Sequence, residues 1–351
     1  MKGLYRELVS VTRDIKSMLP VELEDYFKTI GENPYRLKQV VSWLHKGVTS
    51  FSEMTNISYE FRNKLDKDFH ITAPVLEKKY VSDIDGTAKY LWRLPDKEAI
   101  ESVLMEYEHG LSVCLSTQVG CRMGCVFCAS GMDGLIRNLT AAEILDQIIF
   151  TQTDIGKRIS NIVLMGIGEP LDNFDNVLRF IKLVIDKNGL NIGARHITLS
   201  TCGVIENIDK LADFGIQLTL AVSLHAPDDT TRKRLMKSAH KYKVDDILAS
   251  CNNYFKKTGR RITYEYAFID GVNDSPRHGE LLANKLGSSN CHLNFIYLNQ
   301  IPDCDLKPSP KENVEKFISY IKQGGINYTI RRNLGSDITA SCGLLRKQPG
   351  S

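Results

Sequence analysis

The sequence has no apolar run of the roughly 20 residues that a bilayer-spanning helix needs, which excludes an integral membrane protein. Its first residues, MKGLYRELVSVTRDIKSML, contain no apolar h-region and include acidic residues, so they predict neither a signal peptide nor a transit peptide. Internal repeats and low-complexity tracts are also missing. With 42% hydrophobic and 25% charged residues, the 351-residue chain is typical of a soluble globular protein of about two domains. We expect it to be cytoplasmic.

A strong excess of either charge sign is missing as well. Lys and Arg number 45 against 42 Asp and Glu, for a net charge of +3, so composition supports a nucleic-acid partner only weakly. Basic residues do gather near the two ends of the chain, at Arg36, Lys38, Lys46, Arg62, Lys64, Arg331, Arg332, Arg346 and Lys347. Such groups more often form a solvated face than a phosphate-binding one.

The nine cysteines are odd in number and irregularly scattered, which favours reduced thiols over a disulfide framework. Three of them are spaced Cys121-x₃-Cys125-x₂-Cys128, and no second pair follows, because the next cysteine, Cys202, stands alone. Structural zinc commonly uses two pairs. Three thiolates on a four-iron cluster leave one iron open to a substrate, whereas a closed cluster uses four cysteines. We therefore predict a [4Fe–4S] cluster with one open iron, and a zinc site is the alternative.

Three regions follow one another along the chain. Residues 1–73 predict a small helical module, because apolar residues recur there at the spacing of one helical face. Residues 74–99 predict a linking β-hairpin, because the apolar-rich runs VLEKKYV and AKYLWRL flank an Asp-Gly turn at residues 85 and 86. From residue 100 to residue 351, strand-like and helix-like segments alternate.

The alternating segments predict a parallel sheet, either doubly wound or closed into a barrel. Strands are expected at 111–116, 159–165, 196–200, 217–223, 261–268, 291–297 and 326–331. Helices are expected at 141–154, 174–187, 204–214, 243–257, 276–286 and 311–323. Sites in such folds lie at the C-terminal ends of the strands. The cysteine triplet follows the first strand, and Gly166-Ile-Gly168-Glu169-Pro170 follows the second, where glycines let a ligand approach the backbone.

The cysteine triplet, with Phe127 before its last cysteine, and the glycine-rich strand end with Glu169 resemble the radical S-adenosylmethionine (SAM) enzymes. Longer segments resemble the RlmN family of adenine-C2 RNA methyltransferases: CLSTQVGCRMGCVFCASGMDGLIRNLT, LMGIGEPLDN, RHITLSTCG, LAVSLHAPDDTTR and SDITASCGLLR. NPYRLKQVVSWLHKGVTSFSEMTN resembles the accessory domain of that family. The resemblance implies a partial (βα)6 TIM-like barrel with a small N-terminal helical accessory domain. It also implies methylation of 23S rRNA at C2 of one adenosine in the peptidyl-transferase centre, and of tRNA at the adenosine 3′ of the anticodon.

The resemblance also implies roles for individual residues. Cys121, Cys125 and Cys128 would hold the [4Fe–4S] cluster. The SAM contacts would be Gly168, Glu169, Ser200, Ser223, Leu224, His225 and Asn299. Cys342 would carry the methyl group to the RNA, Glu101 would accept the C2 proton, and Cys114 would resolve the covalent adduct by forming a disulfide with Cys342. A reducing partner such as flavodoxin or ferredoxin would supply electrons, and we expect a monomer that needs no membrane.

Several departures leave other interpretations open. Thr339, Ser341 and Leu344 depart from the family pattern around Cys342, and Cys202 replaces a small residue of an STSG motif. A Cfr-like enzyme that methylates adenine at C8 and confers antibiotic resistance is the nearest alternative. A zinc-stabilised RNA-binding protein without catalytic activity and an iron–sulfur electron carrier are alternatives of other classes. Basic residues of the N-terminal module predict that the module and hairpin grip folded RNA by its shape and phosphates.

Overall fold

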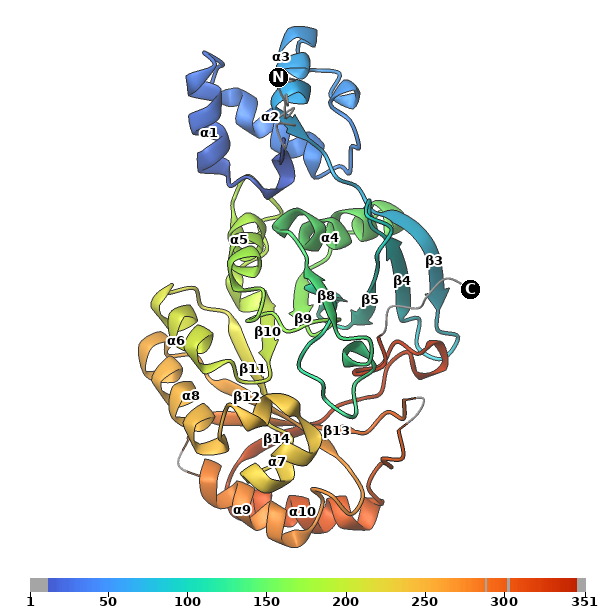
Figure 1. Ribbon diagram of the computed structural model, residues 1–351, viewed down its shortest axis with the longest axis vertical. Helices are drawn as coiled ribbons and strands as arrows, with labels where there is room; N and C mark the ends of the chain where they lie inside the picture. Colours follow the sequence, from blue (N-terminus) through green and yellow to red (C-terminus); the bar gives the residue numbers. More distant parts are fainter. Residues whose placement is uncertain (1–11, 288, 302–303, 346–351) are drawn as a thin grey trace, which may run out of the picture.

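Residues 12–287, 289–301 and 304–345 are described by the computed structural model of the chain. They form a small helical module and a larger α/β domain built around one curved sheet (Figure 1). Arg346 and Lys347, two of the basic residues near the C-terminal end, lie outside the described residues. Within the described part, no helix is both long and apolar enough to cross a bilayer.

The N-terminal module is helical, as its apolar spacing predicts. Its described part contains α1 (Pro20–Thr29), α2 (Tyr35–Leu44) and α3 (Tyr59–Asp68). The helices bury their apolar faces in a core of their own, where Phe27 packs edge-on against Phe61 with 5.2 Å between the ring centres. Two short strands, β1 (Arg13–Asp14) and β2 (Phe69–His70), pair in parallel and bring the two ends of the module together.

A buried ion pair joins this module to the α/β domain. Lys16 Nζ lies 2.5 Å from Asp146 Oδ1, and both side chains are 1% exposed. Beside it, the Ala142 N–H donates to Ser17 Oγ at 3.1 Å. Removing either member of a buried ion pair is strongly destabilising, so the module is an integral part of the fold.

Ten strands of the described chain form one mixed sheet in the order β14-β13-β12-β11-β10-β9-β6-β5-β4-β3. The parallel strands are β6 (Gly110–Cys114), β9 (Asn161–Leu164), β10 (Ile197–Thr201), β11 (Thr219–Ser223), β12 (Ile262–Phe268), β13 (Cys291–Tyr297) and β14 (Asn327–Ile330). Their spatial order follows the chain order without reversal, which is the topology of a barrel and not of a doubly wound sheet. Because β14 and β3 do not pair with each other, the barrel is partial.

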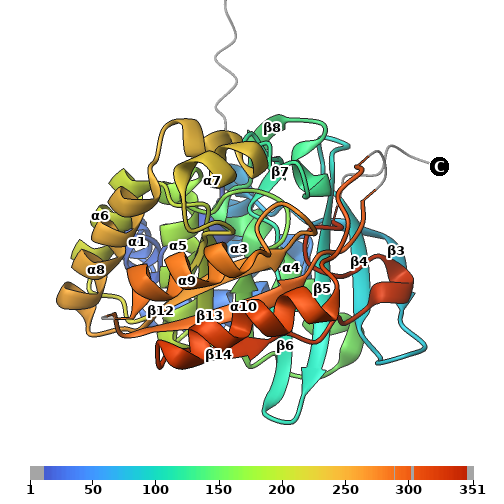
Figure 2. The same ribbon diagram turned by 90° about the horizontal axis from the view of Figure 1, so that it is seen from below.

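Helices connect successive parallel strands and cover the outer face of the sheet (Figure 2). The connecting helices are α4 (Ala141–Ile155), α5 (Phe174–Ile185), α6 (Ile205–Asp213), α8 (Val244–Thr258), α9 (Pro276–Leu286) and α10 (Lys311–Gln323). The first of them starts with the Thr140 capping box, in which Thr140 Oγ1 accepts the Glu143 N–H at 3.2 Å. The expected six β/α units are therefore confirmed.

Two parts of the fold differ from the sequence-based expectation. The hairpin of β3 (Val75–Val81) and β4 (Ala88–Arg93) does not stand apart as a linker, because β4 pairs with an additional strand, β5 (Ala99–Tyr107), which pairs with β6. The hairpin therefore extends the barrel sheet. Polar residues buried within β5 obscure its strand pattern. A short helix, α7 (Asp229–Leu235), also escapes the sequence pattern, because its 7 residues make only about two turns and include a single apolar side chain, Leu235.

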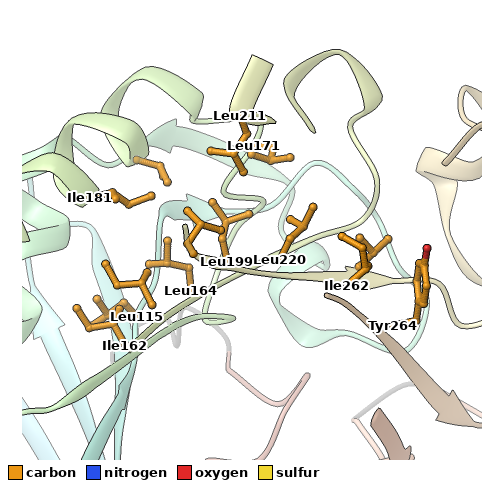
Figure 3. Packing of buried hydrophobic residues seen from close by; sticks show 14 of the residues in the cluster. Leu115, Ile162, Leu164, Leu171, Ile181, Leu199, Leu211, Leu220, Ile262 and Tyr264 are labelled. Atoms are coloured by element: carbon orange, nitrogen blue, oxygen red, sulfur yellow. The ribbon is translucent and has the colours of Figure 1, made fainter. Parts of the chain in front are cut away.

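The main core lies between the sheet and the outer helices (Figure 3). Leu164, Leu199 and Leu220 come from adjacent strands and point toward helical residues such as Ile181 and Leu211. Successive residues of a strand point to opposite faces of the sheet. The neighbours of these leucines along the strands, such as Ser200 next to Leu199, therefore point toward the interior of the barrel. The same alternation that builds the core thus delivers polar groups to the inner face.

Candidate functional site

A cavity opens at the C-terminal ends of the parallel strands and holds about 990 Å³ when its mouth is counted. Among its lining residues are Cys121, Cys125, Cys128, Gly168, Glu169, Ser200, Cys202, Ser223, His225, Glu265, Asn299, Arg331 and Cys342. Most of the site residues implied by the sequence are thus brought together. Glu101, Cys114 and Leu224 are the exceptions among them, because they do not line this cavity.

The three clustered cysteines lie on a loop between two short strands, β7 (Gln118–Gly120) and β8 (Leu135–Asn138). Backbone hydrogen bonds hold the loop, including one from the Cys121 N–H to the Gly134 carbonyl at 2.9 Å and one from the Val126 N–H to the Leu235 carbonyl at 3.0 Å. Burial raises the pKa of Cys121 to about 12 and raises the pKa of Cys125 and of Cys128 as well. Buried thiols that share one cavity suit metal ligation, which deprotonates them.

The arrangement of these ligands distinguishes a cluster from a single ion. Among the described residues, no group of three or more His, Cys, Asp or Glu side chains is placed to hold one metal ion. In a four-iron cluster the three thiolates bind three different irons, so the sulfurs need not converge on one point. The donor set of the cavity therefore fits a [4Fe–4S] cluster.

Gly168 and Glu169 shape the wall next to the cysteine loop. Gly168 has φ of +109°, and a Cβ atom there would lie 2.7 Å from the Gln118 Cβ, so a side chain is excluded. Burial raises the pKa of Glu169, and its carboxylate accepts the N–H groups of Leu171 at 3.0 Å and Cys202 at 2.7 Å. These bonds link the ends of β9 and β10. The glycine lets the backbone of this wall pack closely against Gln118, while the bonds of Glu169 fix the adjacent strand ends.

The next two strand ends present small polar groups and one histidine. Ser200 and Ser223 line the cavity from β10 and β11. His225 follows β11 with φ of +55°, and its Nδ1 accepts the Ala267 N–H at 3.0 Å. Burial and the nearby Arg232 charge lower the pKa of His225 to about 3, so the imidazole is neutral. Leu224 lies between Ser223 and His225 in the sequence, and its side chain packs in the hydrophobic core, away from the cavity.

Arg232, on α7, is a functional-site residue that sequence reasoning missed. Its guanidinium is fully buried and donates to the carbonyls of Cys202 at 2.5 Å, Leu224 at 3.2 Å and Tyr242 at 3.3 Å. It thereby ties together the ends of β10 and β11. The sequence signal that could have found this helix is Asp228, a residue type that favours the N-cap position. Its Oδ1 accepts the Thr231 N–H at 2.9 Å, and Arg232 is the next residue in the helix.

Cys342 reaches the cavity from the C-terminal segment. Its side chain is exposed and lines the cavity with the cysteine loop. Asn299 Nδ2 donates to the Cys342 carbonyl at 3.0 Å, and the Ala129 N–H donates to the Gly343 carbonyl at 2.8 Å. Asn299, which the resemblance implies as a SAM contact, therefore also supports the backbone at Cys342.

Arg331 interacts electrostatically with Cys114 and Cys342, two of the six cysteines outside the triplet. A negative charge on Cys342 is the main cause that raises the pKa of Arg331. The pKa of Cys114 is raised to about 12, mainly by burial. A negative charge on Cys342 also raises this pKa, whereas the positive charge of Arg331 lowers it. Arg331 Nη1 also lies 3.7 Å from Glu265 Oε2, a buried oxygen that accepts no hydrogen bond within the described structure. The positive charge of Arg331 therefore lies near both cysteines.

Glu101 lies below the C-terminal segment. It is 2% exposed on β5, and its Oε1 lies 3.1 Å from Lys89 Nζ. In the β5–β6 register Val103 faces Cys114, so Glu101, two residues from Val103, shares the face of Cys114. Val103, Ala340 and Leu345 form a small buried cluster against which Cys114 packs. The segment that carries Cys342 therefore covers the strand face that carries both Cys114 and Glu101.

Two family profiles match the chain. The Radical SAM superfamily matches residues 115–281, and the ribosomal RNA large subunit methyltransferase N-terminal domain matches residues 14–71. The first range includes the parallel strands β9 to β12, and the second lies within the helical module.

Curated relatives and a solved structure extend over nearly the whole chain. A "probable dual-specificity RNA methyltransferase RlmN" from Alkaliphilus oremlandii is 49% identical over 335 residues, which are 95% of this chain and 98% of the relative. Its counterpart in Clostridioides difficile is 48% identical over 334 residues, covering 95% and 97%. The crystal structure of a radical SAM methyltransferase from Sphaerobacter thermophilus superposes with a TM-score of 0.90 at 38% identity, covering 96% of this chain and all of the other.

Proposed function

Because this chain belongs to the RlmN family of radical SAM methyltransferases, we propose that it methylates C2 of an adenosine in 23S rRNA and in tRNA through a methyl group carried on Cys342. The rRNA target is in the peptidyl-transferase centre, and the tRNA target is the adenosine 3′ of the anticodon. One observation carries the proposal: a single cavity is lined both by the cysteine triplet and by Cys342. A zinc-stabilised binding protein or an electron carrier could use a fourth cysteine as a metal ligand, but the family membership of the chain disfavours both alternatives.

The cofactor would be held by residues of one wall of the cavity. Cys121, Cys125 and Cys128 would ligate the [4Fe–4S] cluster, and Gly168, Glu169, Ser200, Ser223, His225 and Asn299 would surround SAM. When bound, the cluster and SAM supply a one-electron cleavage that yields a 5′-deoxyadenosyl radical. Leu224 would contribute through its position in the backbone, since its side chain lies in the core.

Cys342 would act twice. Its thiolate, placed near the positive charge of Arg331, would first take a methyl group by nucleophilic displacement. The S-methyl group would then lose a hydrogen atom to the 5′-deoxyadenosyl radical, and its carbon would bond to C2 of the adenine. The hydrogen bond from Asn299 to the Cys342 carbonyl would hold the backbone during both steps.

Glu101 and Cys114 would complete the reaction from the strand face beneath. Glu101 would accept the C2 proton of the adduct, and Lys89 Nζ, 3.1 Å from Glu101 Oε1, would hold the carboxyl group in place. Cys114 would then attack the sulfur of Cys342, so that a disulfide forms and the carbon–sulfur bond to the RNA breaks.

The helical module would bind the RNA. Arg36 lies over the ring of Tyr35 and Lys46 over that of Trp43, so cationic and aromatic groups are paired on its surface. Deleting residues 1–73 would also remove Lys16 from buried Asp146, so the charge reversal Lys46→Glu is the better test. We expect it to weaken RNA binding about 10-fold and to leave reductive SAM cleavage unchanged. A cytoplasmic monomer reduced by flavodoxin or ferredoxin completes the proposal.

The proposal is tested by nucleoside analysis. The anaerobically reconstituted protein is incubated with SAM, a reductant and fragments of 23S rRNA or tRNA, and the digested RNA is examined by mass spectrometry. We expect 2-methyladenosine in both RNAs. Formation of 8-methyladenosine would assign the chain to the Cfr-like alternative, and a protein that retains zinc and does not cleave SAM would refute the proposal altogether.

A further inference from the structure

The turn of the β3–β4 hairpin contacts the segment that carries Cys342. Ser82 Oγ donates to Asp337 Oδ1 at 2.7 Å, and the Asp83 N–H donates to Asp337 Oδ2 at 3.1 Å. In the opposite direction, the Gly335 N–H donates to Asp85 Oδ2 at 2.9 Å. These bonds join parts of the chain that are about 250 residues apart, since Asp85 and Gly335 are separated by 250 positions.

Both carboxylates in this contact are fully engaged. Asp85 uses its second oxygen, Oδ1, to accept the Thr87 N–H at 2.9 Å within the hairpin turn. Burial raises the pKa of Asp85, but the hydrogen bonds from Thr87, Gly335 and Ser82 together lower it. Asp337 accepts one bond with each oxygen. Hydrogen bonds to ionised carboxylates are about twice as strong as neutral ones.

A second attachment holds the other end of the same segment. Beyond Cys342, the Gly343 carbonyl accepts the Ala129 N–H at 2.8 Å, and the Leu345 carbonyl accepts Ser130 Oγ at 2.7 Å. Ala129 and Ser130 directly follow Cys128 of the cysteine loop. The exposed Cys342 thus lies on a short span that is fixed to the hairpin on one side and to the cysteine loop on the other.

We propose that Ser82, Asp85, Gly335 and Asp337 form a clasp that positions Cys342 over the cavity, with Asp85 and Asp337 as positioning residues. This inference rests on the proposed role of Cys342 as methyl carrier. Without the clasp, the segment from residue 335 to Cys342 would keep the hydrogen bonds from Lys89 and Asn299 and its attachment near Gly343. The backbone around Gly335 and Asp337 would regain conformational freedom. A carrier that is no longer held near its reaction partner loses most of the advantage of proximity.

The local geometry of the segment is built around the clasp. Gly335 has φ of +63°, and a Cβ atom there would lie 2.7 Å from the Ala340 Cβ. Ser341, one of the departures from the family pattern, donates from Oγ to the Leu334 carbonyl at 2.8 Å. Ser341 therefore adds a hydrogen bond that joins the two ends of the stretch from Leu334 to Ser341, directly before Cys342. The hairpin is thus more than an edge of the sheet, because its turn supports the catalytic segment.

The test uses Asp337→Asn and Asp85→Asn in the full-length, cluster-loaded protein. Either change places an NH₂ group opposite a backbone N–H or the Ser82 hydroxyl and breaks one bond of the clasp. Asp83→Asn is the matched control, because the Asp83 carboxylate lies in the same turn and makes no hydrogen bond within the described structure. Protection of the β9 and β10 amides in hydrogen exchange shows that each variant is folded.

We expect both clasp variants to lower kcat about 10-fold with KM for the RNA within about two-fold of wild type. We also expect more 5′-deoxyadenosine per methylated RNA, because the cluster and SAM site are intact while the methyl carrier is displaced. Amides of residues 336–345 should exchange at least about 10-fold faster than in wild type and in Asp83→Asn.

Two outcomes would overturn the clasp and one concerns only the underlying function. Wild-type exchange at 336–345 in both variants, or an unchanged ratio of 5′-deoxyadenosine to methylated RNA, contradicts the positioning role. If wild-type protein itself never methylates Cys342, the proposed function fails, while the exchange measurement still decides whether the clasp holds the segment.

Discussion

The ammonium nitrogen of Lys89 lies 3.1 Å from Oε1 of Glu101, and the two side chains are 3% and 2% exposed. Lys89 Nζ also donates to the Thr339 carbonyl at 3.5 Å, in the segment that carries Cys342. The ion pair thus links the inner face of β4 and β5 to that segment. The ammonium group offsets the negative charge of Glu101 in this buried place.

Lys89→Met should lower the free energy of unfolding by about 3–5 kcal/mol, because Glu101 loses its ammonium partner in a buried site. Lys79→Met is the control from the same hairpin: Lys79 pairs with Asp154, and these side chains are 33% and 27% exposed. An exposed pair is worth less than about 1 kcal/mol. Denaturant unfolding of the apoprotein measures both. A similar loss for both variants would contradict the structural role of the Lys89–Glu101 pair.

Cys114→Ala and Cys342→Ala should behave differently. Without Cys114 the adduct cannot be resolved, so Cys342 stays bonded to the RNA and a covalent protein–RNA species accumulates. Without Cys342 no methyl carrier exists, and no adduct forms. Denaturing electrophoresis with labelled RNA separates the two outcomes. Identical behaviour of the two variants would refute the assigned roles.

Release of RNA from the adduct should depend on pH. Burial raises the pKa of Cys114 to about 12. Below that value the attacking thiolate fraction increases about tenfold with each pH unit. In the adduct Cys342 carries no charge, so it no longer raises the pKa of Cys114. Burial is the larger cause of the raised pKa, and it persists in the adduct. We expect adduct decay to accelerate about tenfold per unit between pH 7 and pH 9 in quenched single-turnover reactions. A flat profile would show that thiolate formation does not limit resolution.

Arg331→Met should slow the same step. The guanidinium charge lowers the pKa of Cys114, so its removal leaves less thiolate at a given pH. A nearby charge commonly shifts a pKa by about one unit, which corresponds to a decay about tenfold slower and to more adduct at steady state. Arg332→Met provides the control, because Arg332 is the adjacent basic residue and does not line the cavity. Equal adduct lifetimes in the two variants would exclude Arg331 from this role.

Much of the fold follows from local pattern. The helices expected at 276–286 and 311–323 are α9 and α10 to the residue, and every expected strand from 111–116 to 326–331 is present. Apolar spacing determines these elements because each must bury one face. The hairpin also formed where its Asp-Gly turn predicted. β5 and α7 were missed because buried Glu101 and Ser102 and buried Arg232 resemble solvated residues until their partners are known.

Some residues of the candidate site could likewise be predicted from the sequence, whereas the role of others depends on the fold. The spacing of Cys121, Cys125 and Cys128 alone indicated an open cluster, since those ligands lie on one short loop. From the sequence, Arg331 could be named only as one of the basic residues near the C-terminal end, and the fold placed it near Cys114 and Cys342. The roles of Glu101, Cys114 and Cys342 were implied by resemblance and stay predictions.

By itself, the sequence determined which chemical groups the protein possesses, the order of its strands and helices, and the local loop of metal-binding thiols. Only the tertiary structure decided which distant groups meet: Asp85 with Gly335, Lys89 with Glu101, and Arg331 with Glu265. The physical reason is that local periodicity depends on neighbours along the chain, whereas these contacts depend on how strands and loops far apart in sequence pack around one barrel.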